Sequence, residues 1–354
     1  MARLSDCKST LLQLPPAQTL RTGFHSKLAA AIGIEPASLA STASVRNASE
    51  LVGVSVKNLL SPRLTYTFTG HSNIVYGVAV CADGERIVSC SYDKTVKVWN
   101  RSSGQVLHSF GKHTGGVLCV ALFSDGKRVV TGSGPEDRTV RVWSLDSGIE
   151  MRSFVGHAER VFDVAVAPDD CTVASASWDE TVKLWNAYSG RCDATLTGHS
   201  SHVWCVAFSA DGAMLASGSQ DSMIRLWNVR SRYVMRTISG HTGAVRAVAF
   251  NGEWLVSASE DETIKVWEPQ SGERIMTFDS HVDEVRCVAV FPDGGARVVS
   301  GSADNTIRIW NMRSGRCEHT LEGHTNAIAS VAVSRDGRTL LSGGLDESVR
   351  VWRL

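Results

Sequence analysis

The chain contains no apolar run that approaches the 18 or more residues of a membrane-spanning helix. It also carries no excess of charge, because Lys and Arg together number 36 and Asp and Glu also number 36. Residues 1–63 hold seven basic and three acidic residues, which leaves the rest of the chain at −4. Since nucleic-acid phosphates are bound by basic surfaces, we expect neither a membrane span nor a nucleic-acid partner.

The nine cysteines include no CxxC pair, and neither a Walker loop nor a dinucleotide fingerprint is present. Cys119, Cys205 and Cys287 occupy the same position at the start of apolar segments, where cysteine behaves as a small hydrophobic residue. No secretory leader is recognisable before residue 64. We therefore expect reduced thiols in an intracellular protein, cytoplasmic or nuclear, and no structural disulfides.

What the sequence does contain is one unit of about 42 residues, present in seven copies. In each copy an aspartate stands six residues before a tryptophan, and a histidine stands upstream of both. The pairs are Asp93/Trp99, Asp137/Trp143, Asp179/Trp185, Asp221/Trp227, Asp261/Trp267, Asp304/Trp310 and Asp346/Trp352. The histidines are His71, His113, His157, His199, His241, His281 and His324.

Gly-His opens five of the copies, and Trp-Asn stands near the end of four. By these motifs and their period, residues 64–354 resemble a WD-repeat (WD40) β-propeller. The resemblance implies an all-β fold, a seven-bladed β-propeller of four-stranded antiparallel blades. In the fifth repeat, alternation at a period of two predicts strands over 244–250, 255–259, 263–267 and 274–278.

The ends of the repeat region predict how the ring closes. The last repeat reaches only a third strand, and residues 64–68 resemble the fourth strands of other repeats. We expect this N-terminal strand to complete the last blade, which would remove an exposed sheet edge. Residues 1–63 show no repeat and form a separate N-terminal extension. Two interpretations of it stay open, a flexible or partly helical extension and an organelle-targeting or adaptor segment.

The repeated histidine, aspartate and hydroxyl residues suggest a catalytic triad. A serine precedes the aspartate by four residues in six repeats, and Thr131 is the equivalent in the second. In the family that the chain resembles, these groups and the tryptophan form a buried hydrogen-bonded chain. An arrangement present in all seven repeats fits a structural need better than one active site. We therefore expect no enzyme activity, no catalytic residue, no metal and no cofactor.

The resemblance also indicates where a partner would bind. WD-repeat propellers commonly use the face that bears the residue before each aspartate and the residue entering each first strand. Aromatic and arginine side chains, which are enriched at interface hot spots, gather at these positions. The predicted partner-binding residues are Tyr76, Tyr92, Phe162, Trp178, Trp204, Arg246 and Arg286.

These features predict a non-enzymatic protein-protein interaction scaffold that binds a protein or peptide partner on one propeller face, in keeping with a place in a multiprotein complex. The alternative is a substrate receptor of a cullin-RING ubiquitin ligase, because Trp227-Asn-Val-Arg230 and Trp310-Asn-Met-Arg313 resemble the end of the docking box of such receptors. Both segments carry Asn where that box prefers an acid, and no F-box is visible. The sequence does not name the partner, because propellers host many unrelated functions.

Overall fold

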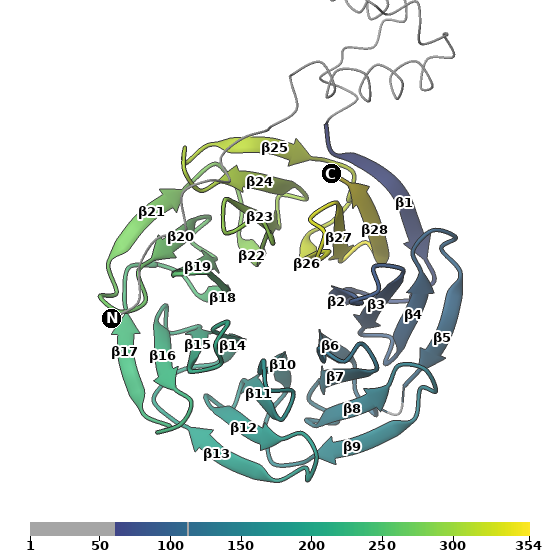
Figure 1. Cartoon of the computed structure of the whole chain (residues 1–354), viewed down its shortest axis with the longest axis horizontal. Coiled ribbons are helices and arrows are strands. Elements are labelled where there is room, and N and C mark those ends of the chain that lie inside the picture. Colours follow the sequence, from purple (N-terminus) through teal and green to yellow (C-terminus); the bar gives the residue numbers. More distant parts are fainter. Residues whose placement is uncertain (1–60, 112) are drawn as a thin grey trace, which may run out of the picture. The chain divides into compact units, whose positions relative to one another are not determined.

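The computed structural model describes residues 61–111 and 113–354, so the predictions for residues 1–60 lie outside the described residues. Pro62–Leu354 forms one compact unit. Its 28 strands form seven four-stranded sheets arranged as blades around a central channel (Figure 1). The predicted seven-bladed propeller is therefore confirmed.

Within each blade the strands follow one another outward from the channel (Figure 1). The innermost strands of blades 1 to 7 are β2 (Val75–Val80), β6 (Val117–Leu122), β10 (Val161–Val166), β14 (Val203–Phe208), β18 (Val245–Asn251), β22 (Val285–Val290) and β26 (Ile328–Val333). The second strands are β3 (Arg86–Ser91), β7 (Arg128–Ser133), β11 (Thr172–Ser177), β15 (Met214–Ser219), β19 (Trp254–Ser259), β23 (Arg297–Ser302) and β27 (Thr339–Gly344). The third strands are β4 (Val96–Asn100), β8 (Val140–Ser144), β12 (Val182–Asn186), β16 (Ile224–Asn228), β20 (Ile264–Trp267), β24 (Ile307–Asn311) and β28 (Ser348–Arg353). The outer strands are β5 (Val106–Phe110), β9 (Glu150–Phe154), β13 (Cys192–Leu196), β17 (Val234–Ile238), β21 (Arg274–Phe278), β25 (Cys317–Leu321) and, in blade 7, β1 (Arg63–Thr69).

The ring closes through the first described strand, as the sequence predicts. β1 pairs antiparallel with β28, with Leu64 opposite Trp352 and Phe68 opposite Val349. The Thr65 hydroxyl adds a hydrogen bond of 2.8 Å to the Val351 carbonyl. Blade 7 thus has the strand order β1-β28-β27-β26, and a segment from the start of the propeller covers the edge that β28 would otherwise expose.

The apolar core lies between blades rather than within them. Trp185 of blade 3 is 1% exposed and shares one cluster with Val130 and Val142 of blade 2. In the same way, Trp99 of blade 1 packs with Val349 of blade 7. Because each blade buries its surface against the next, the ring gains stability as a unit.

The predicted hydrogen-bonded chain is present in all seven blades. The indole Nε1 donates to the serine or threonine hydroxyl at 2.8–2.9 Å. That hydroxyl lies 2.7–2.8 Å from His Nε2, and His Nδ1 lies 2.7–2.9 Å from the Asp Oδ2. Thr131 takes the serine's place in blade 2, which confirms the assignment from spacing.

The direction of this chain follows from the chemistry of its members. An indole nitrogen can only donate, so the hydroxyl accepts from it and donates its own hydrogen to His Nε2. The remaining hydrogen on Nδ1 then donates to the aspartate. Burial lowers the pKa of His71, His113 and His241, which favours this neutral form. Burial opposes the ionisation of Asp221, but hydrogen bonds from His199 and from backbone N–H groups hold its pKa well below the usual range.

Candidate functional site

One residue in the innermost strand of every blade has no partner in the second strand. In β10, Val161 pairs with Ser177 and Asp163 pairs with Ala176, so Phe162 is left over. A β-bulge of this kind re-aims the extra side chain. The seven bulge residues, here called the bulge ring, are Tyr76, Leu118, Phe162, Trp204, Arg246, Arg286 and Ala329. They coincide with the strand-entry positions identified in the sequence.

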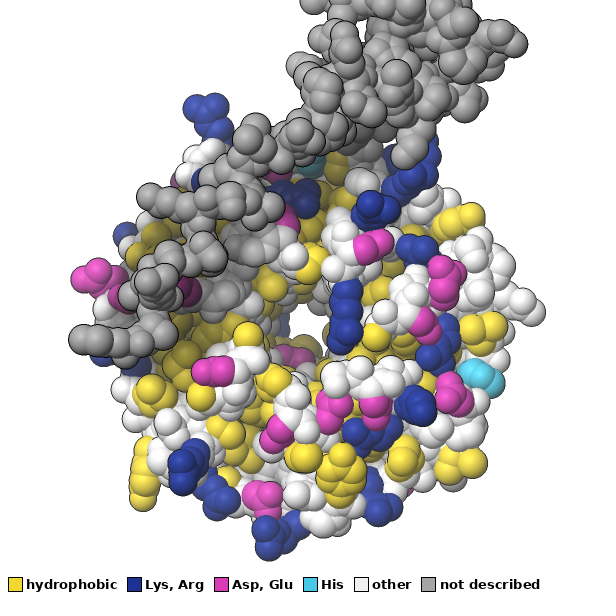
Figure 2. Space-filling view, viewed as in Figure 1, with side chains coloured by type: hydrophobic (Ala, Val, Ile, Leu, Met, Phe, Trp, Pro, Cys, Tyr) yellow, Lys and Arg dark blue, Asp and Glu magenta, His cyan; other side chains and the backbone are white. Residues whose placement is uncertain are grey.

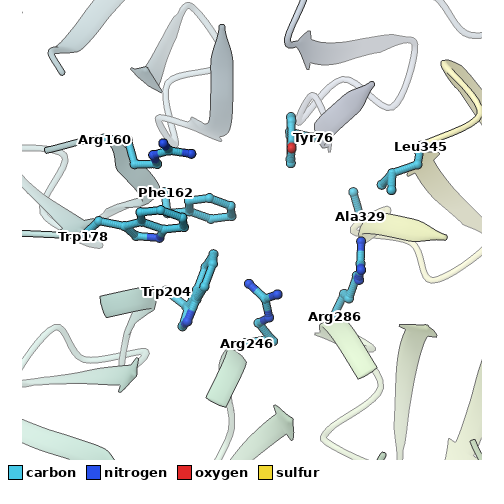
Figure 3. A pocket seen from close by; sticks show the side chains of 9 residues that line it. All are labelled: Tyr76, Arg160, Phe162, Trp178, Trp204, Arg246, Arg286, Ala329 and Leu345. Atoms are coloured by element: carbon cyan, nitrogen blue, oxygen red, sulfur yellow. The ribbon is translucent and has the colours of Figure 1, made fainter. Parts of the chain in front are cut away.

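Six members of the bulge ring line a pocket of about 260 Å³, the rim pocket (Figure 3). Its lining residues are Tyr76, Arg160, Phe162, Trp178, Trp204, Arg246, Arg286, Ala329 and Leu345. A second cavity of about 180 Å³ shares these six bulge residues and extends along the innermost strands. The rim pocket is therefore the mouth of the central channel, which is open at the middle of the ring (Figure 2).

Three aromatic rings from two neighbouring blades form one wall of the rim pocket (Figure 3). Phe162 and Trp178 stack with an interplanar angle of 2° and ring centroids 5.9 Å apart. Trp204 stands nearly perpendicular to both, with centroids 4.4 Å from Phe162 and 5.1 Å from Trp178. Gln220 Oε1 accepts a hydrogen bond of 2.9 Å from Trp204 Nε1, and His202 stacks on Trp178. These contacts hold the rings in place, so the wall is formed before any partner arrives.

The two tyrosines among the predicted residues have different positions. Tyr76 lines the rim pocket and meets Phe162 edge to face, with centroids 6.1 Å apart. Tyr92 lies 6.1 Å from Tyr76 and covers Gly116, where an added Cβ would approach the tyrosine ring to 2.4 Å. Tyr92 is not among the residues that line the pocket. The structure therefore brings together six of the seven predicted side chains, with Tyr92 beside them as support for Tyr76.

The arginines of the rim pocket differ in how their charge is balanced. Arg246 stacks on Trp204, with its guanidinium carbon 3.7 Å from the ring centroid, and its Nε lies 2.8 Å from Glu260 Oε1. Arg286 forms an ion pair of 3.2 Å with Glu284. Burial lowers the pKa of Arg246, and the two glutamates counteract this effect. Most of the positive charge of these two arginines is thus compensated.

Arg160 also lines the rim pocket, although the sequence did not identify it. Its guanidinium carbon lies 4.0 Å from the ring centroid of Trp178, and its carbonyl accepts a hydrogen bond of 3.1 Å from the Trp178 N–H. The position two residues before a bulge residue has no repeated chemistry that would mark it. Only the proximity of Trp178, which comes from the next hairpin, reveals its role.

The channel below the rim pocket contains one carboxylate, Asp163, which follows the bulge residue of β10. Its oxygens accept hydrogen bonds of 2.9 Å from the N–H groups of Val164 and Val206, the second of which belongs to blade 4. Burial raises the pKa of Asp163 to about 7. Among the described residues it forms no ion pair, so its charge is uncompensated when it ionises.

The described residues contain no group of three or more His, Cys, Asp or Glu side chains that could hold a metal ion. All eight cysteines in the described ranges are free thiols. No helix in the described part of the chain is long and apolar enough to cross a membrane.

Away from the rim pocket, Trp254 lines a separate cavity of about 220 Å³ between blades 5 and 6, together with Met276 and Met312. This cavity lies at the other end of the strands, because Trp254 begins β19 whereas the rim residue Glu260 follows its end. Arg313, from the segment that resembles a ligase docking box, lies at its edge. The Asn311 carboxamide accepts hydrogen bonds from the Arg313 and Ser314 N–H groups, so it stabilises the turn.

Comparison with known proteins gives the same architecture. The family model described as "WD domain, G-beta repeat" matches residues 62–100, 104–144, 148–186, 190–228, 232–268, 272–311 and 315–353. The crystal structure of the WD40 beta propeller domain of Doa1 is similar at a TM-score of 0.74 and 27% sequence identity, over 82% of this chain and 97% of that one. The vegetative incompatibility protein HET-E-1 of Podospora anserina is 50% identical over 40 residues, which are 11% of this chain. The match spans only 3% of that protein's length.

Proposed function

Because this chain belongs to the WD domain, G-beta repeat family, whose propellers generally mediate protein interactions, we propose that it is a non-enzymatic scaffold that binds a protein or peptide partner at the rim pocket. The contact residues would be Tyr76, Phe162, Trp178, Trp204, Arg246 and Arg286, with Tyr92 behind them. Catalysis has no dedicated residues in this proposal, since the histidine–aspartate–hydroxyl chains act as internal supports of the blades.

One observation carries the proposal: the bulge ring gathers unlike side chains at a position whose neighbours in the strand vary little. The residue before each bulge residue is Val or Ile, and the residue two positions after it is Val in all seven blades, whereas the bulge ring presents two arginines and three aromatic side chains. These rings and guanidinium groups surround a pocket of about 260 Å³. Aromatic and arginine anchors in a preformed pocket are typical of interface hot spots.

The experiment compares two tryptophans of the same chain that are both partly exposed. Partners recovered from native cells by the full chain are measured against Trp178→Ala, which alters the rim pocket, and Trp254→Ala, which alters the distant cavity between blades 5 and 6. Truncation of an anchor costs about 2 kcal/mol, or roughly thirtyfold in affinity. We expect the main partner to be lost with Trp178→Ala and kept with Trp254→Ala.

A blocking variant separates binding from folding. Ala329 is the smallest bulge residue and is partly exposed at the pocket, so Ala329→Trp would fill the space without removing any packing. If both rim variants retained the partner at unchanged affinity while remaining folded by circular dichroism, the working surface would lie elsewhere. The alternative role, as a substrate receptor of a cullin-RING ubiquitin ligase, is tested with one more variant, Arg313→Ala. It would be favoured if the wild-type chain and the three variants above recovered ligase adaptors and Arg313→Ala did not.

A further inference from the structure

We propose that the rim pocket recognises a peptide in which a carboxylate side chain stands next to a large apolar side chain, and that Arg160 is the residue that selects the carboxylate. This inference rests on the proposed function and names the ligand of the same pocket. It changes the roles suggested by the sequence, in which Arg246 and Arg286 were the expected charged contacts.

The first argument is the charge of the pocket wall. Three of the nine lining residues are arginines, and none is acidic. Glu260 and Glu284 lie close by and pair with Arg246 and Arg286. Arg160 forms no side-chain hydrogen bond and no ion pair with any of the described residues. The wall therefore carries one uncompensated positive charge, and that charge belongs to Arg160.

The second argument is the way Arg160 is held. Its guanidinium carbon lies over the Trp178 ring, 4.0 Å from the centroid, and the backbones of the two residues are joined by a hydrogen bond. Figure 3 shows the guanidinium group turned from this ring toward the middle of the pocket. Stacking uses the face of a guanidinium and leaves its terminal in-plane N–H groups available, which is the geometry for binding a carboxylate with two hydrogen bonds. Little side-chain entropy would be lost on binding, because the stack already restricts the rotamers.

The third argument concerns the neighbouring apolar side chain. Phe162, Trp204 and Tyr76 surround the channel mouth, and the wall below them contains mainly valine and cysteine side chains. The one carboxylate in this wall, Asp163, already accepts hydrogen bonds from the Val164 and Val206 N–H groups. A large apolar side chain entering here would be buried among these groups. A cationic side chain would find faces of Trp178 and Trp204 already covered by Arg160 and Arg246 and would meet their charge. The pocket thus favours an anionic partner over a basic one.

The test starts from a phage-displayed random peptide library selected on the immobilised full chain. One enriched peptide is then synthesised with glutamate, glutamine or phosphoserine at its acidic position, and its affinity is measured by fluorescence anisotropy. Arg160→Gln is compared with the matched variant Lys94→Gln, which removes one positive charge from the same face outside the pocket. Lys94 directly follows Asp93, a position at which blades 3, 5 and 7 carry glutamate, so its loss should not disturb the fold.

We expect enriched peptides to pair Asp or Glu with a large apolar residue. The glutamine peptide should bind the wild-type chain about tenfold more weakly than the glutamate peptide. Arg160→Gln should abolish that difference, whereas Lys94→Gln should retain it. Four results would each overturn the inference. The selection could recover no binder, or binders without enrichment of acidic residues. The glutamate peptide could bind Arg160→Gln as tightly as it binds the wild-type chain, or only the phosphoserine peptide could bind. If Trp178→Ala eliminated peptide binding while Arg160→Gln kept the full preference for the glutamate peptide over the glutamine peptide, only this inference would fail. Binding unaffected by Trp178→Ala would instead refute the proposed function.

Discussion

Replacing His199 or His241 by alanine tests whether the seven hydrogen-bonded chains are energetically equal. The two histidines are closely matched in burial, since each side chain is 1% exposed and their aspartates are 8% and 7% exposed. The blades differ in the basic residue four positions after the aspartate. In blade 5, Lys265 Nζ lies 3.1 Å from Asp261 Oδ2, whereas in blade 4 Arg225 donates to Thr237 and does not contact the aspartate.

The magnitude follows from what each substitution leaves behind. Without His199, Asp221 loses its charge-assisted hydrogen bond of 2.9 Å and Ser217 loses its acceptor, which costs about 1–3 kcal/mol for buried polar groups. Without His241, the Asp261 charge is still compensated by Lys265. We expect the loss in blade 5 to be smaller by about 1 kcal/mol, and thermal midpoints of large domains move by about 2–4 °C per kcal/mol.

The assay is thermal and urea unfolding of both variants, followed by circular dichroism at neutral pH and fixed salt. His157→Ala provides a second measurement for a blade in which no basic residue compensates the aspartate, because Lys183 in its blade donates to Thr195 rather than to the aspartate. His157→Ala and His199→Ala should lose similar stability, and His241→Ala should lose less. A loss for His241→Ala equal to or above that of His199→Ala would refute the compensation by Lys265, and a variant of full stability that loses a measurable activity would refute the structural role itself.

Two further predictions concern the closure of the ring and the channel. Removing residues 1–60 should leave the melting temperature nearly unchanged. Removing residues 1–69 deletes β1 and exposes the edge of β28, so this shorter chain should melt at a markedly lower temperature or aggregate. Equal melting temperatures of the two truncated chains would contradict closure by β1. For Asp163, the pKa is about 7 in the folded chain and about 4 in the unfolded chain. Between these pH values the folded chain keeps a proton that the unfolded chain has released. The free energy of unfolding therefore falls as pH rises from about 4 to about 7. The melting temperature of Asp163→Asn relative to wild type should therefore be higher at pH 8 than at pH 5, and the absence of that difference would show that the carboxylate is well solvated.

The propeller was predictable because each blade repeats the same local chemistry. A fixed spacing of aspartate and tryptophan, a histidine 20–24 residues before the aspartate, and alternation at a period of two specify strands, turns and the internal hydrogen-bonded chain. In the fifth repeat the predicted strand over 274–278 matches β21, and the predicted ends at residues 259 and 267 match β19 and β20. The other four boundaries differ by one residue, since β18 spans Val245–Asn251, β19 begins at Trp254 and β20 begins at Ile264. Small differences at strand ends reflect the turns, where pairing depends on geometry more than on residue type.

The candidate site was predictable only in part, because its chemistry depends on contacts between hairpins. The strand-entry positions followed from the repeat, but the bulges at these positions, the pairing of Arg246 with Glu260 and the stacking of Arg160 on Trp178 did not. The lysines show the same limit. Lys183 and Lys265 both stand opposite a threonine of the outer strand, yet only Lys265 turns to the aspartate, and nothing in the two segments distinguishes them beforehand.

Closure of the ring by β1 has a consequence for how this protein is made. During synthesis β1 leaves the ribosome before every other strand of the propeller, but its partner β28 is the last. The joining hydrogen bond from Thr65 to Val351 spans 286 residues of chain. Blades 1 to 6 can form hairpin by hairpin as they emerge, while β1 has no partner until β28 has been synthesised. Pairing between strands so far apart in the sequence is slow. During this time β1 is the strand that chaperones would bind or that would pair with a wrong partner.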